Sequence, residues 1–217
     1  MDRDRCRADL GYKYSLYFEL LKRKIEQYKI WPWLIYNMDE KGFLIGILLK
    51  MKRIFLKWRY KEIKLKQMLQ DGNREWITLI VCICADGTAL APALIYQAVS
   101  GKVQDTWLQD YDYNDQYCFF SLLPSGWMND DLGYKWLIEV FNRQTKDTAR
   151  RQYRLLILDG YRSHTNIKFI NYCNKNKILL AIYPPHLTYT LQLLDIGIFK
   201  PLAIAYNTKV ANFLKDC

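Results

Sequence analysis

Histidine is scarce in this 217-residue chain, which has only His164 and His186. Six cysteines are present, but no two of them form a C-x-x-C pair. A structural zinc site, which uses closely spaced cysteine and histidine ligands, therefore has little support. Cys82 and Cys84 alternate with apolar residues along a strand-like run. We interpret them as packing residues on one strand face, in a protein of a reducing compartment.

Long uninterrupted apolar runs are also missing. The most hydrophobic stretch, residues 76–96, is divided by Asp86-Gly87 and by Pro92. We therefore expect a β-hairpin there rather than a membrane-spanning helix. The first ten residues, MDRDRCRADL, contain no apolar core of a secretory signal. Together these absences predict a protein with no membrane partner.

Negative charge is in short supply. The chain has 22 Asp and Glu against 32 Lys and Arg, which gives a net charge of +10. Such an excess favours polyanionic partners, above all nucleic acid, although a merely basic soluble protein is the alternative. About half of the residues are apolar and 15% are aromatic, which is enough for the core of one domain with at most a short appendage.

Residues 50–66, KMKRIFLKWRYKEIKLK, concentrate this positive charge. They include eight basic residues and one acid, with Phe55, Trp58 and Tyr60 between them. Basic residues mixed with aromatic rings suit contact with nucleic-acid phosphates and exposed bases. The predicted nucleic-acid-binding residues are Lys50, Lys52, Arg53, Lys57, Arg59, Lys61, Lys64 and Lys66. The alternative is a solvated basic loop or helix whose aromatic side chains turn inward.

The order of periodic segments predicts an α/β layer fold, with a mixed sheet covered by helices. We expect strands and helices in the following order: helix 14–29, strand 33–40 with Gly42 turning the chain after it, hairpin 76–97 through Asp86-Gly87, an insertion over 98–128, a helix from Asn129 or Asp130 to Phe141, a strand ending at Asp159, a helix over 166–176 capped by Ser163 or Thr165, a strand over 178–185, and a helical stretch after Leu191.

Three aspartates stand at boundaries of these elements. Asp39 ends the first strand, Asp159 ends the fourth, and Asp195 lies on the last helical stretch. Carboxylates at neighbouring strand ends repel each other unless a cation lies between them, and oxygen ligands favour Mg²⁺ or Mn²⁺ over zinc. Each aspartate taken alone is better explained as a turn or helix-capping residue, but three at element boundaries are less easily explained in that way. Glu40 neighbours Asp39 but points to the opposite face of a strand, so we exclude it from direct metal contact.

Six stretches, IYNMDEKGF, DGNREWITLIVCICADGTALAPALIYQ, SGWMNDD, LLILDGYRSH, IYPPH and LQLLDIGIFKPL, resemble successive motifs of a known family. This family is the DDE-superfamily endonuclease domain of pogo-type, mariner-like transposases, common in fungal genomes and related to centromere protein B. The interval of 35 residues between Asp159 and Asp195 is similar to the one this group uses between its second and third acids.

The resemblance implies an RNase H-like mixed five-stranded sheet with helices on both faces over residues 31–217, after an N-terminal helix or linker remnant over 1–30. It implies a metal-dependent DNA endonuclease and strand-transfer domain in which Asp39, Asp159 and Asp195 hold two Mg²⁺ or Mn²⁺ ions. It further implies DNA, in the form of transposon ends, as a partner, together with a homodimer and a nuclear location. His164 and His186 fall in matching motifs, either near phosphate and metal-bound water or in structural hydrogen bonds.

Two other functions remain open at this stage. The chain departs from the family pattern at Tyr161-Arg162, Tyr189-Thr190 and Leu193, which suits a truncated or domesticated DNA-binding relic that no longer cuts. The third alternative is an RNase H-like nuclease that acts on RNA with the same metal chemistry. Metal-dependent turnover would separate the first of these from an active enzyme.

Overall fold

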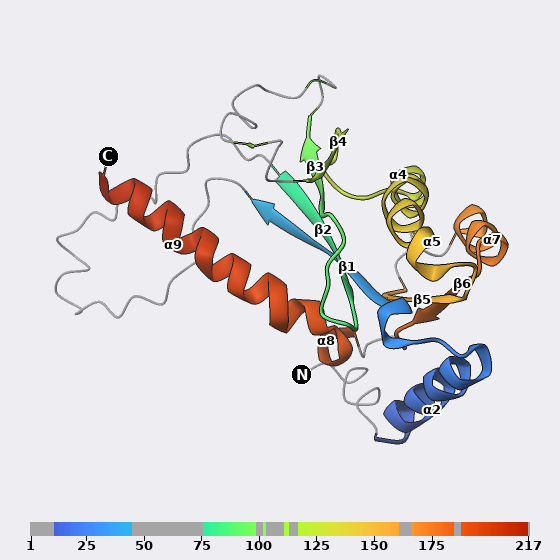
Figure 1. Ribbon diagram of the computed structural model, residues 1–217. Coiled ribbons are helices and arrows are strands. Elements are labelled where there is room, and N and C mark those ends of the chain that lie inside the picture. The colour runs from blue at the N-terminus through green and yellow to red at the C-terminus, as the bar shows by residue number, and fades with distance from the viewer. Residues whose placement is uncertain are drawn as a thin grey trace.

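The computed structural model describes residues 11–44, 76–98, 102, 111–112, 117–160, 166–184 and 188–216. The predicted basic stretch 50–66, His164 and His186 lie outside these residues. The described strands form one mixed sheet in the order β4-β3-β2-β1-β5-β6, which is visible in Figure 1. The strands are β1 (Ile35–Leu44), β2 (Trp76–Cys84), β3 (Ala93–Gln97), β4 (Phe119–Leu123), β5 (Arg154–Leu158) and β6 (Ile178–Ile182).

The helical segments are mostly those that the periodicity predicts. They are α2 (Gly11–Tyr28), η1 (Pro32–Leu34), α4 (Asp130–Trp136), η3 (Leu137–Asn142), α5 (Arg143–Ala149), α7 (Ile167–Lys175), α8 (Thr188–Leu191), η4 (Asp195–Phe199) and α9 (Lys200–Asp216). The Asn129 side chain accepts a hydrogen bond from the backbone N–H of Leu132, which confirms one of the two predicted caps of α4. The cap of α7 was predicted wrongly, because Asn166 takes that position and accepts from the N–H of Phe169.

Strands β1, β5 and β6 are parallel, whereas β2 pairs antiparallel with both β1 and β3. The predicted hairpin is confirmed, with Gly87 at φ 92° in its turn, a backbone conformation that glycine adopts without strain. Strand β4 was not predicted. It lies within the expected insertion and pairs in parallel with β3, so the described sheet has six strands rather than five.

Alternate residues of the central strands enter two separate cores. Leu156 and Leu158 pack on one face with residues of α4, η3 and α7, including Phe141. Leu155 packs on the other face with Leu34 and with apolar side chains of α2. Figure 1 shows α4 and α7 on one side of β5 and β6, with α2 on the other. The prediction that helices cover both faces is therefore confirmed.

Helix α9 extends away from the rest of the molecule beside β1 (Figure 1). The Tyr206 hydroxyl donates a hydrogen bond of 3.5 Å to the carbonyl oxygen of Leu44, and its ring lies 6.2 Å from that of Phe43. These contacts join the segment after Asp195 to the far end of β1. No helix among the residues described here is both long and apolar enough to span a bilayer.

Candidate active site

Asp39 lies within β1, and Asp159 directly follows the last residue of the neighbouring parallel strand β5. The register pairs Ile35 with Leu155 and Asn37 with Ile157, where the pairing ends. The charge of Asp159 acts on Asp39, so the two carboxyl groups are close enough to repel each other. The prediction that Asp39 ends its strand is wrong, because pairing with β2 continues to Leu44. The parallel pairing of β1 with β5, on which the expected meeting of the two aspartates depends, is confirmed.

Gly42, which was predicted to turn the chain after the first strand, lies inside β1 instead. It pairs with Thr78. A Cβ atom at this position would overlap the ring of Trp76. The role of Gly42 is therefore to leave room for the Trp76 ring against the strand, and it does not form a turn.

Asp195 reaches this region from the first residue of η4. Its Oδ1 atom lies 3.2 Å from the Nζ atom of Lys41, and both side chains are partly exposed. Lys41 shares a strand face with Asp39 because the two are two positions apart in the strand. The negative charges of both Asp159 and Asp195 act on Asp39, so the three predicted acids belong to one electrostatic cluster.

Burial raises the pKa of Asp39 to about 7, and repulsion from Asp159 and then Asp195 adds to this rise. A backbone hydrogen bond from Glu40 and the charge of Lys41 oppose it. Asp39 is therefore partly protonated near neutral pH. An approaching cation favours the ionised form of this carboxyl group, so the group would release its proton.

Glu40 is a member of the cluster that the sequence reasoning excluded from direct metal contact. Alternation does place it on the face opposite Asp39, next to Met38 in the core-facing series. Burial nevertheless raises the pKa of Glu40 to about 7, with repulsion from Asp159 and then Asp39 as the next causes. Its Oε2 atom is buried without a hydrogen-bond partner in the structure. The only sequence signal for including Glu40 was its position next to Asp39.

Asn37, two positions before Asp39 in β1, is connected to α2 through Tyr183. The Asn37 Nδ2 atom donates hydrogen bonds to the Ile157 carbonyl at 3.2 Å and to the Tyr183 hydroxyl at 3.3 Å. The Tyr183 ring lies 5.9 Å from that of Tyr17 on α2. Burial raises the pKa of Tyr183, and the nearby Tyr17 and Asp39 contribute to the same direction. Asn37 and Tyr183 thus fix the strand that carries Asp39.

The donor set fits a hard divalent cation in its chemistry. Three neighbouring carboxylates are ligands that Mg²⁺ and Mn²⁺ prefer, and a cation would relieve the repulsion felt by Asp39. Within the described ranges, however, no group of three or more His, Cys, Asp or Glu side chains is arranged closely enough to hold a metal ion. Both other aspartates are near enough to Asp39 to raise its pKa, and Lys41 contacts Asp195.

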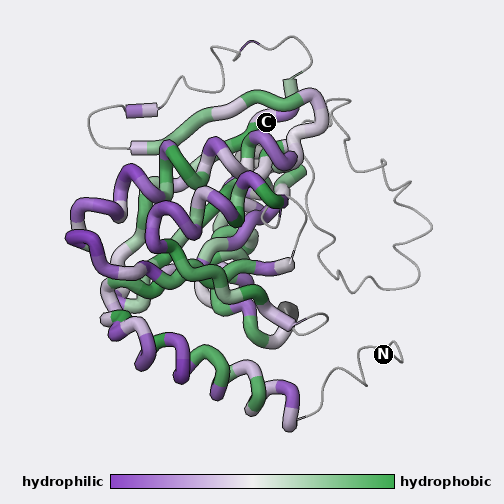
Figure 2. Tube along the Cα trace, turned by 90° about the vertical axis from the view of Figure 1, so that its right-hand side faces the viewer, coloured by the Kyte–Doolittle hydropathy of each residue, from purple (hydrophilic) through white to green (hydrophobic). Residues whose placement is uncertain are grey.

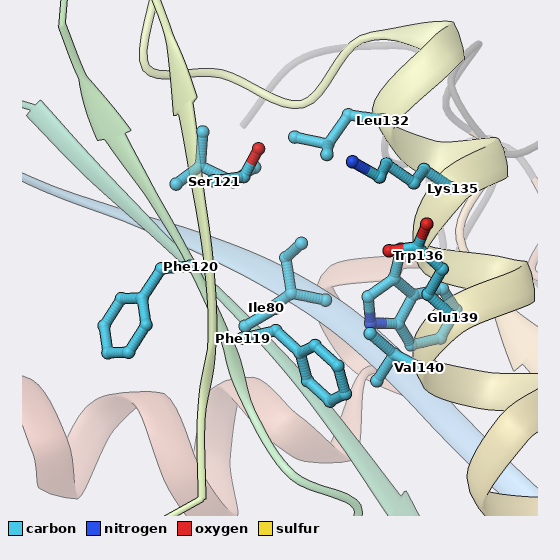
Figure 3. A pocket seen from close by; sticks show the side chains of 11 residues that line it. Ile80, Phe119, Phe120, Ser121, Leu132, Lys135, Trp136, Glu139 and Val140 are labelled. Carbon is cyan, nitrogen blue, oxygen red and sulfur yellow. The ribbon is translucent and has the colours of Figure 1, made fainter. Parts of the chain in front are cut away.

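A separate hollow lies between α4 and the strands β2 to β4. Figure 3 shows Trp136 and Val140 of the helical layer facing Ile80 and Phe119 of the sheet. Its lining is mainly apolar, and none of the three aspartates belongs to it. It is a packing gap beside the core rather than part of the acidic cluster.

Comparison with known proteins shows the family of this chain. Residues 73–216 match the family described as DDE superfamily endonuclease. A protein of Cochliobolus lunatus named MFS-type transporter clz9 is 34% identical over 81% of this chain and 18% of its own length. The human Pogo transposable element with KRAB domain is 35% identical over 64% of this chain and 21% of its length. The chain thus spans about a fifth of each of these relatives.

Solved structures share the fold. The Mos1 mariner paired-end complex with Mn aligns with a TM-score of 0.59 at 12% identity, covering all of this chain and 55% of that chain. The Mos1 catalytic domain with Raltegravir and Mg aligns with a TM-score of 0.52 at 14% identity, covering 92% and 77%. The described sheet and helices therefore have the RNase H-like fold of mariner transposase catalytic domains, as predicted.

Proposed function

Because the chain belongs to the DDE superfamily endonuclease family, we propose that it is a metal-dependent domain that cuts DNA and joins the cut ends to new sites. The observation that supports this proposal is the parallel pairing of β1 with β5 together with the repulsion that Asp159 and Asp195 exert on Asp39. Transposon-end DNA is the proposed substrate, in line with the solved Mos1 complex with a left transposon end.

In this proposal Asp39, Asp159 and Asp195 hold two Mg²⁺ or Mn²⁺ ions. Such ions, when bound, would activate water and then a freed 3′-hydroxyl for in-line attack on a phosphodiester. The chain itself supplies the preorganisation. Asn37 holds the strand through Tyr183, Asp39 would give up its proton to a bound cation, and Lys41 would be displaced from Asp195 toward a DNA phosphate.

The inactive DNA-binding relic remains the second candidate, because one observation favours it. Lys41 already neutralises part of the cluster through its 3.2 Å contact with Asp195. A lysine in that place competes with a cation for the carboxylate. In a relic the basic charge would still bind DNA while the aspartates held no metal.

The test is a calorimetric titration with MnCl₂ of the wild type, of Asp159→Asn, and of Glu19→Gln as a control carboxylate that lies exposed on α2. We expect saturable binding that Asp159→Asn abolishes and Glu19→Gln keeps. The same proteins are then incubated with supercoiled plasmid and Mn²⁺. Nicking by all but Asp159→Asn supports the enzyme.

The other two candidates give different results in the same assays. A relic would retard DNA in a gel without binding Mn²⁺ or nicking. An RNA nuclease would cleave the RNA strand of a hybrid duplex and leave the plasmid intact. Either result would overturn the proposed DNA endonuclease.

We further propose that the active form is a homodimer and that it acts in the nucleus. The support is indirect, since a transposase must reach chromosomal DNA and the solved Mos1 structure is a paired-end complex. Light scattering with and without duplex DNA would test the dimer. A fluorescent fusion of the full chain would test the nuclear location, and exclusion from nuclei would contradict it.

A further inference from the structure

Three helices end at the same edge of the sheet. Helix α2 leads into β1, α5 leads into β5, and α7 leads into β6 through short connections. Because these strands are parallel, the C-terminal ends of the three helices gather at the starts of the strands. Figures 1 and 2 show α2 lying along this part of the molecule. The acidic cluster lies beyond the opposite end of β5, beside the middle of β1.

Five basic side chains mark these helix ends, and we call them the basic edge. They are Lys24, Lys29, Arg150, Arg151 and Lys177. All are exposed except Lys24, which is half-buried. The residues that follow Lys29 and precede Arg150 meet in one core, where Ile30 packs with Ala149. The cations therefore surround a common buried cluster, although they are distant in sequence.

Aromatic rings hold two of the ammonium groups in place. The Tyr28 and Tyr153 rings lie 4.5 Å apart between centroids. The Nζ atom of Lys24 is 5.7 Å from the centre of the Tyr28 ring, and that of Lys177 is 5.7 Å from the Tyr153 ring. Lys177 also donates a 3.0 Å hydrogen bond to the Arg151 carbonyl. These contacts link the members of the edge into one surface.

The backbone at this edge is strained. Every non-glycine residue with positive φ in the described part of the chain belongs to it: Lys29 at 51°, Arg150 at 44°, Arg151 at 70° and Lys177 at 56°. Glycine or asparagine usually fills such positions at helix ends, since the left-handed conformation costs other residues about 1–2 kcal/mol. A cation near a helix C-terminus gains only about 0.3–1 kcal/mol. Helix termination alone therefore does not account for the four basic residues.

The charge of the edge is largely uncompensated. Among the residues that the structure describes, no carboxylate forms an ion pair with any of the five cations. Glu26, on the same helix as Lys24, is 3.9 Å from Lys22 instead. We propose that the basic edge is a sequence-independent binding surface for the phosphate backbone of duplex DNA.

This surface is distinct from the acidic cluster. Strand β5 separates the two with five residues, which span roughly 17 Å at the usual rise per residue. Phosphates bound at the edge are therefore not the phosphates held at the aspartates. The inference stands whether or not the aspartates cleave DNA.

The test uses the full chain in EDTA, so that metal binding and cleavage play no part. Fluorescence anisotropy follows binding of a labelled 30-base-pair duplex by the wild type and by the variant Arg150→Asn/Arg151→Asn/Lys177→Asn. Asparagine tolerates positive φ and removes the charge, so the variant should fold. A matched control, Lys135→Gln/Lys200→Gln/Lys209→Gln, loses the same charge at exposed sites on other helices.

We expect the edge variant to bind about tenfold more weakly at 0.1 M KCl, and the slope of log affinity against log salt to fall by about 2–3. The control should change affinity less than twofold. An unchanged affinity and slope, or an equal loss in the control, would overturn the proposal. A lower melting temperature without weaker DNA binding would assign the charges to helix ends alone. Preferential binding to phosphatidylserine vesicles over DNA would also overturn it.

Discussion

The charge balance around Asp39 depends on single residues, and Lys41 is the most directly testable. Its ammonium group and any divalent cation compete for the Asp195 carboxylate. A partly exposed ion pair contributes about 0.2–1 kcal/mol, which corresponds to a factor of roughly 1.4–5 in affinity. We predict that Lys41→Met raises Mn²⁺ affinity by this factor in calorimetry. Lys209→Met on α9 should leave it unchanged, and a weaker affinity for Lys41→Met would show that Lys41 does not compete.

Asp39 also gives a pH dependence of stability. Its pKa of about 7 in the folded protein exceeds that of an unfolded aspartate, so the folded state holds the proton more tightly. Between about pH 4 and pH 7 the unfolded chain loses this proton first, and stability falls as pH rises. Asp39→Asn removes the titrating group. We predict that this variant melts above the wild type at pH 8 but near it at pH 4.

Thermal unfolding followed by circular dichroism would measure this difference. Each kcal/mol corresponds to about 2–4 °C for a domain of this size. The control is Glu19→Gln, a change at an exposed position of α2. If Asp39→Asn melted below the wild type by the same amount at both pH values, the raised pKa of Asp39 would be contradicted.

At the scale of elements, Gly42 decides how β1 and β2 fit together. A methyl group there would meet the Trp76 ring, so either the ring or the strand must move. Overpacking of this kind costs about 1–3 kcal/mol. We predict that Gly42→Ala lowers the melting temperature, whereas Gly197→Ala in η4, where a Cβ meets nothing within 4 Å, is neutral or slightly stabilising. Equal melting temperatures for the two variants would contradict this packing role.

The elements show which features sequence reasoning can find. The face of α2 with Tyr17, Leu21 and Ile25 is visible as a 3.6-residue period, and the structure buries that face against β5 and β6. Strand β4 gives no comparable signal, because all five of its residues are only half-buried and its pairing with β3 is between distant segments. Local periodicity reports burial, so an edge strand of this kind is missed.

The site was predicted to a similar extent. Asp39 and Asp159 were selected because each is a carboxylate in or directly after an apolar strand, and the pairing of those two strands is confirmed. Glu40 was excluded by strand alternation, which gives direction but not the distance to a neighbour's charge. The contact of Lys41 with Asp195 joins residues 154 positions apart, and no local pattern predicts such a pair.

For the whole molecule, the proposed metal centre links binding to global stability. A ligand that binds only the folded state stabilises it by about 2.7 kcal/mol at a hundredfold excess over its Kd. That corresponds to a rise of about 5–10 °C in melting temperature.

We predict this rise for the wild type in Mn²⁺ at pH 7.5, and a smaller rise at pH 6, because the Asp39 proton competes with the cation below about pH 7. Differential scanning calorimetry of the wild type and of Asp159→Asn measures it, with KCl at matched ionic strength as the blank. The variant should show no rise at either pH. An equal rise in both proteins would mean that Mn²⁺ binds elsewhere on the chain. This result would contradict the proposal that the acidic cluster is the metal centre.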